Sequence, residues 1–300
     1  MSTGKVEPMF AIITNVNATV TGGMDPKACR GVLPPVSRPG NSKPHILWKP
    51  AILAALVLLR AGLGMATTIV AIRSPDYVVL AADSQVTVAS LDGNTAVAEC
   101  KIQEIGANFV GAAGYFRETP RGFSAFDIAR KASNQGGDLM AIADRFERAA
   151  LEPFKASVQR FRQDNPALFA SYCNNRDCLE VAFVGQEGGI NKLSVRCFRV
   201  TTPAEQIVVE PSHRLDCPGN CQAGAAEALL GIHENADALI NRTPHFWMVK
   251  GIVAGIDQLI GTEVEANPGD VGLPISILTI DGSGPHWEPG HRGVCPDAKK

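Results

Sequence analysis

Two short apolar runs rich in β-branched residues stand near residue 70, separated by a polar turn. Residues 67–72 read Thr-Thr-Ile-Val-Ala-Ile, and residues 77–81 read Tyr-Val-Val-Leu-Ala. β-Branched and aromatic residues favour strands, whereas the Ser-Pro-Asp sequence at 74–76 is typical of a turn. The pattern therefore predicts a β-hairpin, with one carboxylate, Asp83, directly after its second strand.

Strand-like and helix-like patterns follow one another in blocks along the rest of the chain. Alternating or continuous apolar runs predict strands at 100–105, 108–114, 179–184, 192–200, 206–209 and 275–280, and a loop or irregular strand pair at 86–98. Apolar residues three and four positions apart predict helices at 122–135, 139–161 (with a kink at Pro153), 223–240 and 246–262. Because strands and helices come in separate blocks, this order favours an α+β layered sandwich over a parallel βαβ sheet.

The first 66 residues differ in character from the rest. Residues 1–48 contain several Pro and Gly and no sustained period, which predicts little structure. The apolar run 51–59 follows a basic flank and is followed by the small residues Gly64 and Ala66. This arrangement fits a signal peptide, because a membrane span needs about 20 apolar residues. The alternative is a propeptide that packs as a helix.

Three parts of the chain follow from this interpretation. Residues 1–66 are predicted to be a leader that is removed, 67–285 the folded domain, and 286–300 a flexible tail. We expect no stable membrane span after processing.

Removal of the leader after Ala66 would change the chemistry of Thr67. An N-terminal threonine carries a hydroxyl nucleophile and a free α-amine on one residue. The amine, whose usual pKa is about 7.7–8.0, can accept the hydroxyl proton directly or through a water molecule. Thr67 is therefore the candidate nucleophile, although a threonine in a β-branched run is by itself an ordinary strand residue.

Composition excludes several other classes of protein. The 300 residues are 45% hydrophobic and 19% charged with a net charge of −2, which predicts a globular protein without affinity for nucleic acid or an anionic membrane. No Walker-type phosphate loop or Gly-x-Ser-x-Gly elbow appears. The six histidines are scattered, so we interpret them as structural or surface residues and expect no metal or organic cofactor.

Eight cysteines include two close pairs, Cys173/Cys178 and Cys217/Cys221. In an oxidising compartment they predict local disulfides or a link between the two loops, whereas in a reducing compartment they would ligate zinc or stay free. We favour disulfides and, with the leader, a periplasmic or secreted protein; the alternative is a cytoplasmic protein with a cleaved propeptide. Seven cysteines follow Ala66, so at least one is expected to stay free or to pair between chains.

The chain contains a specific series of residues: Thr67, then Asp83 sixteen residues later, then Lys101, and then the sequence Gly-Ala-Ala-Gly at 111–114. In this order and spacing, it resembles the proteasome β-type and HslV-type peptidases, which are N-terminal-nucleophile hydrolases. The resemblance is strong over 67–114 and looser up to residue 280. It implies a four-layer αββα sandwich and a homo-oligomer.

The same resemblance implies a role for each residue. Thr67 would be the nucleophile and its amine the proton acceptor, Lys101 would lower the proton affinity of the hydroxyl, and Asp83 would hold Lys101 and the amine. A positive charge beside a hydroxyl favours the alkoxide-like transition state. The backbone N–H of Gly111 would face the oxyanion, where one donor contributes about 10²–10³ in rate.

The chain departs from that family in three places. The interval from Asp83 to Lys101 is two residues longer than in proteasome subunits. The Asp-x-x-Ser-Gly-Gly element that supports the threonine in the family is replaced by residues 266–274, where Asp270 is the candidate for this support. The cysteine loops have no family counterpart, which leaves ring assembly open.

Three functions follow as hypotheses. The first is a threonine-type endopeptidase that cleaves peptide bonds through an acyl-enzyme. The second is a periplasmic small-molecule amidohydrolase or acylase of the same superfamily. The third is a non-catalytic proteasome-like scaffold protein that keeps the fold without the cut.

Overall fold

The computed structural model describes residues 63–64, 67–90, 93–118, 122–221 and 225–298. The apolar run 51–59, interpreted above as part of a leader, lies outside these residues. Within the described parts of the chain, no helix has the length and apolar character needed to span a membrane.

The predicted hairpin is present as β2 (Thr68–Arg73) and β3 (Val78–Ala82). The two strands pair antiparallel, from Ile69 opposite Ala82 to Arg73 opposite Val78. Ser74 closes the turn: its N–H donates to the carbonyl of Tyr77 at 2.8 Å, and its Oγ accepts from the N–H of Tyr77 at 3.1 Å. The hairpin prediction is therefore confirmed.

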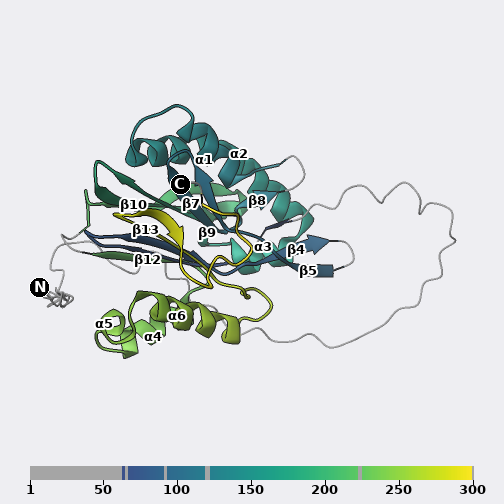
Figure 1. Cartoon of the computed structure of the whole chain (residues 1–300). Helices are drawn as coiled ribbons and strands as arrows, with labels where there is room; N and C mark the ends of the chain where they lie inside the picture. The colour runs from purple at the N-terminus through teal and green to yellow at the C-terminus, as the bar shows by residue number, and fades with distance from the viewer. Residues whose placement is uncertain (1–62, 65–66, 91–92, 119–121, 222–224, 299–300) are drawn as a thin grey trace, which may run out of the picture.

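Two five-stranded antiparallel sheets form the centre of the structure (Figure 1). One has the order β11-β10-β9-β7-β6, built from β6 (Ile102–Ile105), β7 (Asn108–Gly114), β9 (Arg176–Glu187), β10 (Ile190–Thr201) and β11 (Val208–Cys217). The other has the order β12-β2-β3-β13-β14 and adds β12 (Ala226–Gly231), β13 (Ser276–Asp281) and β14 (Gly284–Trp287). Two smaller pairs are β1 (Leu63–Gly64) with β8 (Arg117–Glu118), and β4 (Gln85–Ser90) with β5 (Gly93–Ala98).

Helices lie on both sides of the paired sheets. On one side are α1 (Ala125–Ser133), α2 (Leu139–Asp164) and α3 (Pro166–Tyr172); on the other are α4 (Glu234–Arg242), α5 (Phe246–Lys250) and α6 (Ile252–Ala266) (Figure 1). A short 3-10 helix, η1 (Pro203–Glu205), precedes β11. The mixed α and β class with antiparallel sheets is thus confirmed.

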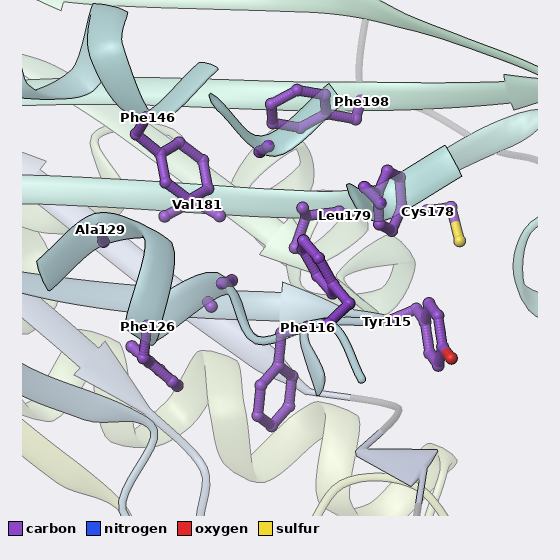
Figure 2. Packing of buried hydrophobic residues seen from close by; sticks show 14 of the residues in the cluster. Tyr115, Phe116, Phe126, Ala129, Phe146, Cys178, Leu179, Val181 and Phe198 are labelled. Atoms are coloured by element: carbon purple, nitrogen blue, oxygen red, sulfur yellow. The ribbon is translucent and has the colours of Figure 1, made fainter. Parts of the chain in front are cut away.

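An aromatic core joins α1 and α2 to the first sheet, as Figure 2 shows. Phe146 of α2 packs edge-on against Phe198 of β10, with ring centroids 6.0 Å apart, and Tyr115 stacks on Phe161 at 4.9 Å. A second apolar cluster, which includes Ile69 and Val195, fills the space between the two sheets. Burial of these apolar faces fixes the two sheets against each other. It thereby also fixes the positions of Thr67 and Asp83, at the ends of the hairpin.

Several predicted elements differ from the observed ones. Residues 226–231 form strand β12, although the pattern predicts a helix over 223–240; they pair with β2, and this tertiary pairing outweighs the helix propensity of Ala, Glu and Leu. The helix predicted over 246–262 is divided at Gly251, whose φ is +74°. Residues 86–98 belong to the β4–β5 hairpin.

Both predicted cysteine pairs are disulfides in the structure, Cys173–Cys178 and Cys217–Cys221. Their sulfurs are therefore not available as zinc ligands, and the described residues contain no cluster of three or more His, Cys, Asp or Glu that could hold a metal ion. A third disulfide, Cys100–Cys295, joins residues 195 positions apart, which the spacing of the cysteines does not predict. Cys197 is buried between the sheets.

The predicted tail is attached to the domain as far as the structure describes it. The carbonyl of His291 accepts the N–H of Ile277 at 2.7 Å, and the indole of Trp287 donates to the carbonyl of Pro296 at 2.9 Å. The Cys100–Cys295 disulfide adds a covalent tie directly before Lys101. The end of the chain therefore helps to hold the start of β6.

Removal of the long-range disulfide is expected to destabilise the protein more than removal of a local one. In the chain-entropy model, Cys100→Ser/Cys295→Ser loses about 5 kcal/mol and Cys173→Ser/Cys178→Ser about 2 kcal/mol. Urea unfolding of both double variants measures the difference, after peptide mapping of non-reduced protein has verified the pairings. Equal losses would show that loop length does not determine the contribution here.

Candidate functional site

Asp83 is the centre of a buried hydrogen-bond cluster at the end of the hairpin. Its Oδ1 accepts from Lys101 Nζ at 2.8 Å and from the N–H of Thr68 at 2.9 Å. Its Oδ2 accepts from the N–H groups of Gln85 and Gly272, each at 3.0 Å. A buried charge is tolerated where it is paired and hydrogen-bonded, and this carboxylate has both kinds of partner.

Lys101 lies at the start of β6 with its side chain fully buried against Asp83. Burial lowers the pKa of the Lys101 ammonium, and the charge and hydrogen bond of Asp83, with the charge of Glu99, offset this only in part. A lysine whose pKa is lowered gives up a proton more readily than an exposed one. The site therefore holds a buried lysine, paired with Asp83, whose positive charge can stabilise negative charge nearby.

Thr67 is fully buried and directly precedes Thr68, whose N–H donates to Asp83. Its carbonyl accepts the N–H of Ile232 at 2.9 Å, and the hydroxyl of Thr68 donates to the carbonyl of Ile232 at 2.5 Å. Gly231, which pairs with Thr68, has a φ of +78°, and a Cβ there would lie 1.9 Å from the Thr67 oxygen. Only glycine fits at that position. The turn after β12 thus holds Thr67 from the side opposite to Asp83.

Residues 63–64 form a short strand, β1, along β8. Gly64 pairs with Arg117, and Leu63 pairs with Glu118. Arg117 in turn makes a bidentate ion pair with Glu99, with N–O distances of 2.7 and 2.6 Å. Residues 63–64, which precede the cut predicted after Ala66, therefore occupy the edge of β8.

Gly111 makes no described contact with Asp83, although it pairs with Ile102, the residue after Lys101. It lies inside β7, opposite Ile102 of β6 on one side and Ala182 of β9 on the other. Gly111 thus has a strand on each side, and its role as an oxyanion donor stays a prediction. A Cβ at Gly111 would lie 3.2 Å from Ile69, so this glycine permits close packing of the two sheets.

Within residues 266–274, a backbone N–H supports Asp83, and the Asp270 side chain contacts a different residue. The carboxylate of Asp270 accepts the hydroxyl of Tyr172 at 2.8 Å, whereas Gly272 donates its N–H to Asp83 and accepts the N–H of Ser84 at 3.0 Å. Ser84 Oγ also donates to the carbonyl of Pro274 at 2.5 Å. Any residue except proline can donate a backbone N–H, so the sequence does not reveal this role of Gly272. It draws attention to Asp270 because that residue has a carboxylate.

A second buried polar group, which the sequence did not predict, lies at the turn that bonds the Thr67 carbonyl. Glu180 of β9 accepts the N–H of Gly231, and His233 Nδ1 lies 3.2 Å from Asp237 Oδ2. Glu180 and His233 are both almost completely buried. The signal that the sequence offers is the i, i+4 spacing of His233 and Asp237 at a helix start, which is common in structural histidines.

Comparisons with known proteins do not identify a function for this chain. No family model and no curated protein matches the chain. Among solved structures, the Anbu (Gly-1) mutant from Hyphomicrobium sp. strain MC1 is similar at 15% identity, over 72% of this chain and 81% of that chain, with a TM-score of 0.39. A TM-score of this size does not establish a shared fold.

Proposed function

We propose that this chain is an N-terminal-nucleophile threonine hydrolase that cleaves peptide bonds after residues 1–66 are removed. The observation that carries the proposal is the buried Lys101–Asp83 pair beside Thr67: Asp83 bonds both Lys101 Nζ and the N–H of Thr68, the residue after the proposed nucleophile. The two sheets with helices on both sides would then be the four-layer αββα sandwich of this class.

The reaction has two stages. The Thr67 hydroxyl gives its proton to the new α-amine, directly or through a water molecule, and attacks the amide carbonyl. The C–N bond breaks, the amine product leaves with a proton, and the acyl group stays on Thr67 as an ester. Water then hydrolyses that ester. The Lys101 charge acts in a buried site, where its stabilisation of negative charge is larger than in water.

The disulfides favour a second candidate substrate. Three intrachain disulfides are typical of an oxidising compartment, which supports a periplasmic or secreted location. A periplasmic amidohydrolase that acts on small N-acyl compounds would use the same Thr67 chemistry. A homo-oligomer remains part of the proposal, and light scattering of the purified protein tests it.

N-terminal sequencing of the protein purified from a bacterial host tests the proposal first. We expect the mature chain to begin Thr-Thr-Ile-Val, because the Thr67 nitrogen can act as a base only as an amine and not as part of a peptide bond. Fluorogenic peptides and N-acyl amino acids, assayed side by side, then distinguish the two substrate classes. A purified chain that begins upstream of Thr67 and is inactive on both would contradict the proposal and favour the non-catalytic scaffold.

A further inference from the structure

We propose that Glu180, His233 and Asp237 form an acid–imidazole–acid group, centred on the buried His233, that positions Thr67 for attack. We call these three residues the β9–α4 clamp. The inference rests on the proposed hydrolase function, to which it adds a positioning residue, His233, on the side of Thr67 opposite to Lys101.

Gly231 connects the clamp to Thr67. Its N–H donates to the carboxylate of Glu180, which belongs to the other sheet and lies opposite Ala113 of β7. Gly231 also lies against the carbonyl of Thr67, since a Cβ added to this glycine would lie 1.9 Å from that oxygen. Glu180 therefore fixes a residue whose backbone lies directly against Thr67.

His233 holds the other end of the same turn. It occupies the position before α4, with only 5% of its surface exposed, and its Nδ1 contacts Asp237 Oδ2 at 3.2 Å. Its backbone carbonyl also accepts the N–H of Asp237 at 2.8 Å. Between Gly231 and His233 stands Ile232, which bonds both the Thr67 carbonyl and the Thr68 hydroxyl. The turn that holds Thr67 is thus anchored at both ends by the clamp.

Charge keeps the clamp together at neutral pH. Burial by itself lowers the pKa of His233, but the hydrogen bond of Asp237 and the charges of Glu180, Asp237 and Glu234 outweigh burial and raise the pKa to about 9. His233 is therefore an imidazolium at pH 7, flanked by carboxylates from β9 and α4. From α6, Glu263 caps the start of α4 by accepting the N–H of Ala236 at 2.7 Å.

Loss of the His233 proton would remove the positive charge that interacts with the buried Glu180 and the partly exposed Asp237. Their repulsion loosens the turn, and a misplacement of about 1 Å at a reacting group can cost about 100-fold in rate. Activity should then fall as the pH rises through about 9, the pKa of His233.

Stability gives a readout that does not depend on activity. The folded-state pKa of His233 is raised from 6.5 to about 9, so its contribution is fully present below pH 6.5 and is lost as the pH rises through about 9. The urea midpoint of the wild-type chain should therefore fall between pH 6.5 and 9. In His233→Gln this part of the fall should disappear.

The pH–rate profile of the processed enzyme decides the inference, because Lys101 could also produce an alkaline limb. Asp237→Asn removes a group that raises the His233 pKa, whereas the charges that raise the Lys101 pKa are those of Asp83 and Glu99. We therefore expect the alkaline limb of Asp237→Asn to move down by about one pH unit. His233→Gln should lower kcat about tenfold or more with little change in KM. The matched control is Asp281→Asn, which removes a carboxylate 4.0 Å from the partly exposed His286.

The outcomes separate the two proposals. A wild-type chain that is unprocessed or inactive overturns the hydrolase function, and the positioning role with it. An active wild type whose Asp237→Asn profile and His233→Gln kcat match those of Asp281→Asn overturns the clamp alone. If His233→Gln fails to fold, the shift of the alkaline limb in Asp237→Asn decides the question.

Discussion

Thr67→Ala is expected to abolish turnover, by a factor on the order of 10⁶, while the protein stays folded. The substitution removes the attacking oxygen but keeps the backbone carbonyl that accepts the N–H of Ile232. The cluster around Asp83 should also stay in place, because Asp83 bonds the N–H of Thr68 and the ammonium of Lys101. The measurement is kcat on the best substrate, with unfolding by urea as a check on the fold.

Thr67→Ser is the matched variant, because serine keeps both the hydroxyl and the α-amine. It should retain measurable turnover after the leader is removed. Intact mass must show that each variant begins at residue 67, so that a processing defect is not mistaken for a catalytic one. Wild-type turnover in correctly processed Thr67→Ala would disprove the nucleophile.

Lys101→Met is expected to lower kcat by about 10³-fold, equivalent to about 4 kcal/mol of transition-state stabilisation. Methionine has a similar length but no charge, so Asp83 would keep its backbone donors and lose its counter-ion. Breaking a buried ion pair in this way costs about 3–5 kcal/mol of folding stability. Activity and urea unfolding should therefore both change.

The double variant Lys101→Met/Asp83→Asn separates the structural role of the pair from its catalytic role. With the carboxylate neutralised, the buried charge that lost its counter-ion is gone, and part of the lost stability should return. Activity should not return, because the positive charge beside Thr67 is still absent. Stability that falls in Lys101→Met while kcat stays near wild type would make the lysine purely structural.

Local features of the chain were predictable because local interactions produce them. The hairpin follows from two β-branched runs and a Ser-Pro-Asp turn, and the Ser74 hydroxyl makes the expected turn bonds. The Cys173–Cys178 and Cys217–Cys221 disulfides join residues five and four positions apart. Such pairs are close in any compact conformation of the chain, so sequence spacing alone identifies them.

The position of β12 cannot be predicted in the same way. Residues 226–231 have helix-forming composition, and they become a strand because the edge of β2 needs a partner. Likewise, the place of Gly111 between β6 and β9 could not be predicted from a short stretch of sequence. Sheet order depends on which apolar faces bury each other over the whole chain, and no short window of sequence contains that information.

The sequence by itself determined which reactive groups are present: Thr67, which a cut after Ala66 would expose, and Asp83 and Lys101 at a spacing similar to that of proteasome-type peptidases. The resemblance already implied that Asp83 holds Lys101, and the structure contains this pair. Only the tertiary structure decided that Gly272 supports Asp83 through its backbone, and that Glu180 and His233 lie at the turn that bonds Thr67. The physical reason is that residue type sets what a group can do, while burial and pairing between distant segments set where it does it.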